Sequence, residues 1–221
     1  MEALTLVIGN KNYSSWSLRP WLFLKHNGVP FSEVPVALYQ PHSALRQYSP
    51  SGLVPVLHHD DLWVWDSLAI CEYVSERFLN GKGWPTNMAA RAVARAVSAE
   101  MHSGFQNLRS NLPMNLKARY KWKPVSEATE KDIRRIVEIW EECRARYGNS
   151  GPWLFGTFSI ADAMFAPVAW RFHIYGVPLG GIAQEYTQQL LELDGMLAWH
   201  ADAVKESEAL PQFEAQGWEP V

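Results

Sequence analysis

Residues 53–74 constrain the fold more than any other part of the chain. They hold an apolar strand over 54–57 that begins with a Val-Pro pair, a second short strand over 63–65, and an amphipathic helix that opens at Asp66 and Ser67. A strand edge with proline leaves backbone groups free to pair with an extended peptide. A helix N-terminus that carries serine offers amides and a hydroxyl to an anion. Because Asp66 offers an acceptor to a cation, the stretch suits a small zwitterionic peptide whose amino and carboxyl groups share one carbon.

The composition excludes several classes of partner. The chain has 221 residues, of which 48% are hydrophobic. This is enough to form the core of one large domain or of two small ones. The net charge is -3 and no basic run occurs, so we expect neither nucleic acid nor a membrane surface as a partner. Cys71 and Cys143 show no metal-type spacing, so we expect no metal site and a reducing compartment. No leader and no long apolar run are found, so a cytoplasmic location is expected.

The first part of the chain alternates between strand and helix patterns. Further strands are expected over 4–9 and 31–38, a helix over 17–27 with Ser17 as its N-cap, and a short helix over 43–48. Followed by the two strands and the helix of 53–74, this order predicts a small mixed sheet with helices packed on it, βαβ–ββα.

A Gly- and Pro-containing stretch, residues 80–85, ends this pattern and is typical of a linker. Strand patterns vanish after it, and the expected helices cover 87–112, 126–147, 159–175, 184–193 and 196–207. The helix at 159 begins with a Ser-x-x-Asp capping box. We therefore predict a first domain over 1–80, a linker over 81–86 and an all-helical domain over 87–221.

Four motifs, in this order along the chain, carry a family resemblance: Ser14–Arg19, Val54-Pro55, Asp66-Ser67 and the Ser-Ile-Ala-Asp-Ala run from Ser159. The sequence resembles the cytosolic glutathione transferases over nearly its whole length. The first motif resembles the Ser-Ser-Cys-Ser-Trp-Arg motif of their zeta class. The resemblance implies a thioredoxin-like N-terminal domain, a helical-bundle C-terminal domain, a cis Val54-Pro55 bond and a homodimer.

The resemblance also implies an enzyme that uses glutathione as co-substrate and attacks an electrophilic, largely apolar small molecule. A thiol with a pKa of ~8.5 is only about 3% thiolate at pH 7, and lowering that pKa by ~2 takes ~2.7 kcal/mol of thiolate stabilisation. Ser14 is the implied stabilising hydroxyl, with Ser15 as the alternative. For either serine, a plain helix cap is the structural alternative.

The same resemblance assigns binding roles in the first domain. Val54 and Pro55 would place backbone groups against the cysteinyl unit, Ser67 would hold the γ-glutamyl carboxylate, and Asp66 its ammonium group. The glycyl carboxylate has no clear partner, and the candidates are Gln40, His42 and Arg46.

The second substrate is expected between the domains, where Trp16, His102 and Phe105 are the candidate pocket residues. Trp16 stands where the zeta motif has Cys, so a flat apolar wall is expected there. Helical spacing also fits Phe105 to the core, and a structural hydrogen bond is the alternative for His102.

Two other functions stay open at this point. One is a glutathione-dependent isomerase of zeta type, similar to maleylacetoacetate isomerase, for which Arg19 and Arg109 are the nearby basic residues. The other is a binding protein of the same fold without catalysis.

Overall fold

The computed structural model describes residues 4–38 and 45–221 of the chain. Gln40 and His42 lie outside the described residues, and so does the start of the short helix predicted over 43–48.

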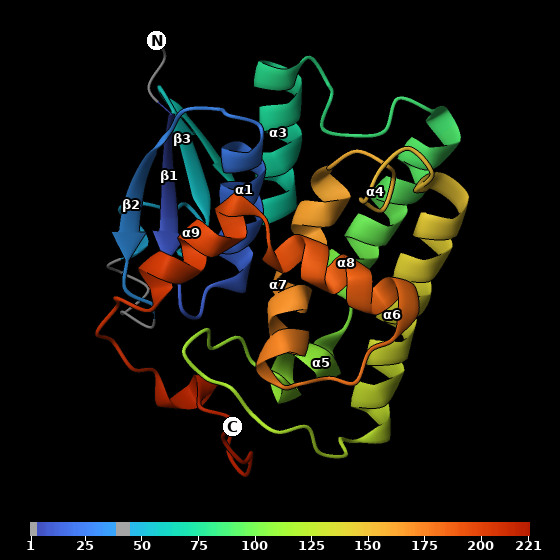
Figure 1. Cartoon of the computed structure of the whole chain (residues 1–221). Helices are drawn as coiled ribbons and strands as arrows, with labels where there is room; N and C mark the ends of the chain where they lie inside the picture. Colours follow the sequence, from blue (N-terminus) through green and yellow to red (C-terminus); the bar gives the residue numbers. More distant parts are fainter. Residues whose placement is uncertain (1–3, 39–44) are drawn as a thin grey trace.

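A four-stranded mixed sheet forms the N-terminal domain (Figure 1). Its strands are β1 (Leu4–Gly9), β2 (Ser32–Val36), β3 (Val56–His59) and β4 (Leu62–Trp65), in the order β2-β1-β3-β4. β1 and β2 pair in parallel, and helix α1 (Ser15–His26) forms the crossover connection between them. The pairs β1–β3 and β3–β4 are antiparallel. Helix α3 (Ser67–Leu79) follows β4. The predicted thioredoxin-like βαβ–ββα arrangement is confirmed.

Helix α1 begins earlier than the sequence predicted. Its N-cap is Ser14, whose side chain accepts a hydrogen bond from the backbone N–H of Ser17. Ser17 was predicted to cap this helix, and that prediction was wrong. Its hydroxyl instead accepts the backbone N–H of Gly9 at 3.1 Å, which ties the helix to the end of β1. Pro20 lies in the second turn of this helix.

The described part of the second domain is helical. It contains α4 (Met88–Ser103), α5 (Gln106–Asn111), α6 (Glu127–Tyr147), α7 (Ile160–Ile174), α8 (Gly181–Leu191), α9 (Asp194–Ala203) and a 3-10 turn (Pro211–Phe213). Helix α7 is buried along its whole length except at His173, and it packs against α1, α4 and α8 (Figure 1). The capping box of Ser159 and Asp162 is present at its start, as predicted. Among the described helices, none is both long and apolar enough to cross a membrane.

The helix predicted over 87–112 is broken into α4 and α5. Gly104 is extended and Phe105 has a φ of 57°, so the chain turns between the two helices. The carboxylate of Asp132 on α6 accepts the backbone N–H of Leu108 at 3.0 Å, which satisfies an amide in the first turn of α5. The break changes the direction of the chain before α5, and Arg109 on α5 lines the cavity between the domains.

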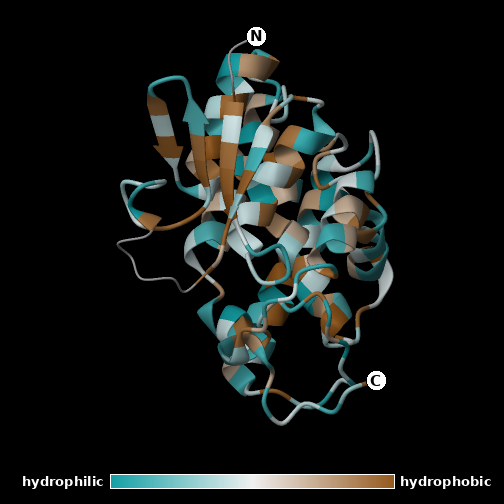
Figure 2. Cartoon of the chain, turned by 90° about the vertical axis from the view of Figure 1, so that its left-hand side faces the viewer, coloured by the Kyte–Doolittle hydropathy of each residue, from teal (hydrophilic) through white to brown (hydrophobic). Residues whose placement is uncertain are grey.

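One continuous hydrophobic core joins the two domains. In Figure 2 the brown, hydrophobic residues run along β1, whose Leu6, Val7 and Ile8 are buried. Cys71 is buried within this core, and burial raises the pKa of its thiol.

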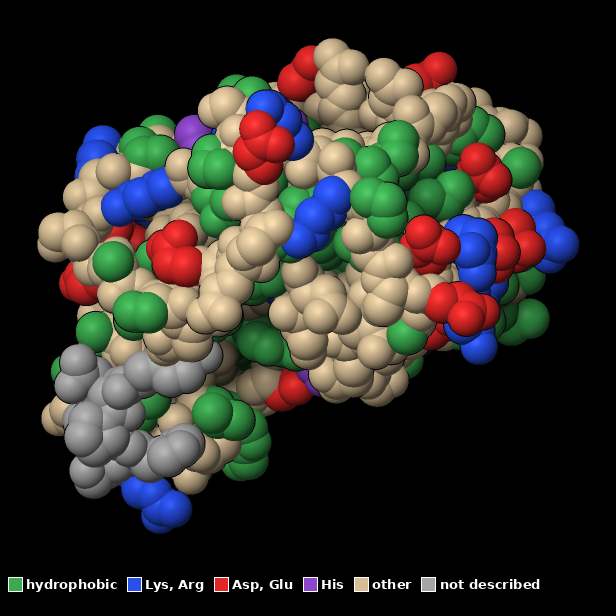
Figure 3. All heavy atoms as spheres, turned by 90° about the horizontal axis from the view of Figure 1, so that it is seen from below, with side chains coloured by type: hydrophobic (Ala, Val, Ile, Leu, Met, Phe, Trp, Pro, Cys, Tyr) green, Lys and Arg blue, Asp and Glu red, His purple; other side chains and the backbone are tan. Residues whose placement is uncertain are grey.

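The C-terminal tail returns across the lower side of the molecule (Figure 1). Tyr120 and Pro220 form an antiparallel bridge, so the last residues lie beside the segment that precedes α6. Seen from this side in Figure 3, hydrophobic side chains and charged side chains of both signs are intermixed.

Candidate functional site

A cavity of about 640 Å³ lies between the two domains. One wall comes from the start of α1 and from loops of the N-terminal domain. The other wall comes from α5, α7 and the C-terminal tail. The lining residues are Tyr13, Ser14, Ser15, Trp16, Leu38, Leu45, Gly52, Leu53, Val54, Gln106, Arg109, Ser110, Arg171 and Phe213.

Both predicted catalytic serines line this cavity. Ser14 caps α1: its Oγ accepts the N–H of Ser17 at 3.3 Å and donates to the Oγ of Ser17 at 2.7 Å. Ser15 is the first residue of the helix, and its Oγ accepts a hydrogen bond from Nη2 of Arg171 at 3.3 Å. The two hydroxyls are therefore neighbours in sequence with different partners.

Arg171 is a buried cation that the sequence reasoning missed. Its guanidinium also donates to the carbonyl oxygens of Arg109 and Leu112. Burial, together with the nearby charge of Arg109, lowers its pKa to about 10. An arginine inside the apolar helix α7 could have been found in the sequence, since a buried arginine nearly always has a specific partner.

The indole of Trp16 is in contact with two cations. The guanidinium carbons of Arg19 and Arg109 are 4.1 and 5.1 Å from its ring centroid, and His102 meets it edge-on at 5.2 Å. Trp16 lines the cavity and provides the flat wall that was expected. Burial is the main cause that lowers the pKa of Arg19 to about 9, and the charges of Arg171 and Arg109 act in the same direction.

Asp66 is the N-cap of α3. Its Oδ1 accepts the backbone N–H groups of Leu68 at 2.9 Å and Ala69 at 3.1 Å, and its Oδ2 lies 2.9 Å from Nε2 of His102. Its φ of 82° is a conformation that L residues rarely adopt, with a strain of about 1–3 kcal/mol. Neither Asp66 nor His102 lines the cavity itself, but His102 links the carboxylate to the Trp16 wall.

Ser67 carries an orphaned polar atom. Its side chain is 2% exposed, and its Oγ has no hydrogen-bond partner among the residues described. A buried hydroxyl without a partner is costly, so such an atom marks a place where a ligand or a water completes the hydrogen bonding. At the N-terminus of α3, an anionic group is the matching ligand.

The Val54-Pro55 peptide bond is cis, as the resemblance implied. It precedes β3, so Val54 stands outside the strand ladder. Its backbone N–H and C=O form no hydrogen bond with another described residue. Val54 lines the cavity, whereas Pro55 lies behind it in the interior.

Phe105, like His102, was predicted as a pocket residue and does not line the cavity. It is 8% exposed and belongs to the hydrophobic core. The core alternative considered for this residue is therefore the one observed. Gln40, the candidate for a glycyl carboxylate, lies outside the described residues, and Arg46 is exposed.

The loop that precedes Ser14 is held by the C-terminal domain. The carboxylate of Glu206 accepts the backbone N–H groups of Lys11 at 2.6 Å and Asn12 at 3.0 Å. Trp199 Nε1 donates to the carbonyl oxygen of Lys11 at 2.8 Å. The start of α1 is thus positioned by residues almost two hundred positions further along the chain.

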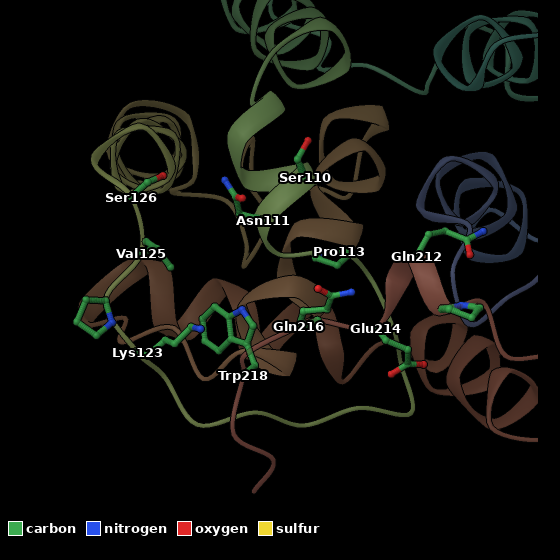
Figure 4. Close-up of a pocket in the computed structure, with 13 residues that line it drawn as sticks. Ser110, Asn111, Pro113, Lys123, Val125, Ser126, Gln212, Glu214, Gln216 and Trp218 are labelled. Atoms are coloured by element: carbon green, nitrogen blue, oxygen red, sulfur yellow. The ribbon is translucent and has the colours of Figure 1, made fainter.

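A second cavity, of about 450 Å³, is lined by residues of α5, of the segment before α6 and of the C-terminal tail (Figure 4). Ser110 and Asn111 reach it from α5, and Gln212, Gln216 and Trp218 reach it from the tail. Ser110 lines both cavities, and the tail contributes Phe213 to the first and Gln212 and Glu214 to the second, so the two cavities are neighbours. Within the described ranges, no group of three or more His, Cys, Asp or Glu side chains has the arrangement of a metal site.

Two family models match the chain. Residues 13–77 match the model described as "Glutathione S-transferase, N-terminal domain", and residues 123–202 match "Glutathione S-transferase, C-terminal domain". Together the two matches span about two thirds of the chain. The first match includes the serines of α1, the Val54-Pro55 pair and the start of α3.

Individual relatives agree with these matches. The chain is 25% identical to "Glutathione S-transferase Z2" of Arabidopsis thaliana over 188 residues, which is 80% of this chain and 84% of the relative. It is 27% identical to a "Stringent starvation protein A homolog" of Pasteurella multocida, over 80% of this chain and 81% of that one.

Among solved structures, a glutathione transferase homolog from Burkholderia gl BGR1, with bound glutathione, superimposes with a TM-score of 0.69 at 20% identity. The match covers 93% of this chain and all of the other. At this identity the likeness is one of fold.

Proposed function

Because the chain belongs to the glutathione S-transferase family, we propose that it binds glutathione in its N-terminal domain and stabilises the glutathione thiolate for attack on an electrophilic small molecule. The electrophile would lie in the cavity between the domains, against Trp16 and the apolar residues Leu38, Leu45 and Phe213.

The buried, partnerless hydroxyl of Ser67 is the observation that carries the proposal. It stands at the N-terminus of α3, where its hydroxyl and its own backbone amide fit the γ-glutamyl carboxylate. Asp66 beside it offers a carboxylate to the γ-glutamyl ammonium group. The backbone groups of Val54, which are unpaired within the described part of the chain, fit the backbone of the cysteinyl unit. These three features complement the γ-glutamyl and cysteinyl units of glutathione.

The N-terminus of α1 supports the thiolate. The positive end of the helix dipole and a serine hydroxyl both favour an anion there, and Ser14 and Ser15 both line the cavity. Arg109 and Arg171 add positive charge to the same cavity. A thiolate is the nucleophilic form of a thiol, so holding it raises the rate of attack on an electrophile.

Titration calorimetry with glutathione tests the binding, and the ultraviolet absorbance of the bound thiolate across a pH series tests its activation. Conjugation of an aromatic electrophile tests the transferase activity. We expect binding, a thiol pKa below ~8.5 and glutathione consumption. Absence of binding contradicts the proposal, whereas binding without thiolate formation supports the alternative of a non-catalytic binding protein.

A glutathione-dependent isomerase acting on a carboxylate-bearing substrate is the second candidate. The observation that favours it is the pair Arg109 and Arg171, which line the cavity and form no salt bridge with any residue described. Two cations in a mostly apolar cavity fit a substrate that carries an acid group. Trp16, at the position where the zeta-class motif has Cys, is a departure from that class.

The two candidates differ in whether glutathione is consumed. An isomerase converts a cis-unsaturated acid to its trans form and leaves the glutathione concentration unchanged. Arg109→Gln should then lower kcat/KM for the acid roughly ten- to hundredfold, because a charge-assisted hydrogen bond is lost. Arg119→Gln is the matched control, since Arg119 does not line this cavity. An equal effect of both substitutions argues against an acid substrate.

Three expectations from the sequence stay predictions: the domain boundaries at 80 and 87, a homodimeric assembly and a cytoplasmic location. Sedimentation equilibrium tests the dimer, and limited proteolysis within residues 81–86 tests the linker.

A further inference from the structure

Ser14 uses its hydroxyl within α1. Its oxygen accepts the N–H of Ser17, and its hydrogen goes to the Oγ of Ser17 at 2.7 Å. Ser17 Oγ in turn accepts the N–H of Gly9, so the three groups form a buried chain of hydrogen bonds between helix and strand. A serine has one O–H to donate, and that of Ser14 is already engaged.

Ser15 presents the opposite arrangement. It is 8% exposed and lines the cavity, and its Oγ accepts from Arg171 at 3.3 Å. Its own O–H has no acceptor in the described part of the chain. Ser15 therefore has a donor left for a ligand, and its oxygen is polarised by a cation. An O–H whose oxygen accepts a hydrogen bond is the stronger donor.

We propose that Ser15, rather than Ser14, donates the hydrogen bond that stabilises the glutathione thiolate, and that Arg171 is the positioning residue that orients the Ser15 hydroxyl. This inference rests on the proposed function. Arg171 is suited to the role because the carbonyl oxygens of Arg109 and Leu112 hold its guanidinium in place. A hydroxyl held by a fixed guanidinium needs little reorganisation when the thiolate forms. Ser14 is then the helix cap.

Alanine substitution of each serine tests this division of roles. The wild-type protein, Ser14→Ala, Ser15→Ala and Ser15→Thr are compared by thermal unfolding, by calorimetry with glutathione and by the pH dependence of thiolate absorbance. We expect Ser15→Ala to lower the thiolate fraction at neutral pH about tenfold, and Ser15→Thr to restore it. Ser14→Ala should lower the melting temperature and leave the thiolate fraction within about twofold of wild type.

The outcomes separate the inference from the function on which it rests. If the wild-type protein binds no glutathione or forms no thiolate, the proposed function fails and the inference fails with it. If the wild-type protein forms the thiolate and Ser15→Ala leaves it unchanged, the inference alone is overturned. Loss of thiolate in Ser14→Ala, alone or to the same extent as in Ser15→Ala, also overturns it.

A double-mutant cycle tests the part of Arg171. Arg171→Lys keeps the charge but removes the fork of donors, so it should lower the thiolate fraction while Ser15 is present. In the Ser15→Ala background the same substitution should have no further effect on the thiolate. A full and additive effect overturns the positioning role. If Arg171→Lys does not fold, the serine variants decide the proposal.

Discussion

Nε2 of His102 on α4 lies 2.9 Å from Oδ2 of Asp66 at the start of α3, so an imidazole of one domain and a carboxylate of the other meet beside Trp16. The other oxygen of the same carboxylate caps α3 through the N–H groups of Leu68 and Ala69. Asp66 therefore offers two separable properties, an oxygen for the cap and a negative charge for a cation.

Asp66→Asn separates the two properties. Asparagine keeps an oxygen that can cap α3, and its N-cap preference equals that of aspartate, so the free energy of unfolding should change by less than about 0.5 kcal/mol. Glutathione affinity should fall about tenfold, because the ammonium group loses its charged partner. Asp66→Ala removes the cap as well and should cost about 0.5–2 kcal/mol of stability. Equal affinity of Asp66→Asn and wild type by calorimetry removes the carboxylate from the binding site.

Ser67→Ala should have opposite effects on stability and binding. The Ser67 hydroxyl is buried without a partner, so its removal should leave the free energy of unfolding unchanged or raise it. A glutathione carboxylate bound there loses a charge-assisted hydrogen bond, so affinity should fall roughly tenfold. Urea unfolding without ligand and calorimetry with glutathione measure the two effects. Ser98 is the control, since its buried Oγ also lacks a partner among the described residues but lies within α4, away from the N-terminus of α3. Ser98→Ala should leave affinity unchanged.

The sequence predicted the elements better than their ends. The strands over 4–9 and 63–65 and the helices after 126 and 159 lie close to where periodicity and capping motifs placed them. The α1 cap was misplaced because Ser14 and Ser17 are equally good capping residues by type. Only the pairing of Ser17 with Gly9 of β1 decides between them, and that contact exists only in the fold.

The site was predictable where it is local and not where it is tertiary. Val54-Pro55 and Asp66-Ser67 are sequence neighbours, so a motif could find them. The contact of Ser15 with Arg171 joins residues 156 positions apart. Arg171 itself stands out as a charged residue in an apolar helix, but the sequence of that helix does not show what the guanidinium contacts. The turn at Phe105, which aims Arg109 at the cavity, depends on Asp132 of another helix and has no local signature beyond Gly104.

Asp162 should give the fold a pH dependence of defined sign. Burial raises the pKa of its carboxyl from the usual 3.8 to about 6, although Leu154, Ser159 and Tyr186 all donate to it. A carboxyl that holds its proton more tightly in the folded state contributes stability below a pH of about 4, and loses that contribution as the pH rises to about 6. The loss from this group is about 3 kcal/mol.

Asp162→Asn should remove that slope. Urea unfolding of wild type and variant at several pH values between about 4 and 7 isolates the contribution of Asp162, because the other carboxylates are common to both. The difference in unfolding free energy should shift in favour of the variant as the pH rises. Glu141→Gln, on the exposed face of α6, is the control and should show a constant difference. A constant difference for Asp162→Asn argues that the carboxyl is ionised throughout this range.

Phe213 should set the preference for the second substrate. Its ring stacks on Tyr13 with centroids 5.2 Å apart, so the C-terminal tail places an aromatic wall over the start of α1. Phe213→Ala should raise KM for an aromatic electrophile about tenfold, because part of a buried aromatic contact worth about 1.5–3 kcal/mol is lost. Glutathione affinity should stay within about twofold, since the residues proposed to bind it lie in the other domain. Gln212→Ala is the matched control, because Gln212 is adjacent in the tail but lines the second cavity (Figure 4). An unchanged KM in Phe213→Ala places the second substrate away from the tail, toward Trp16 and Arg109.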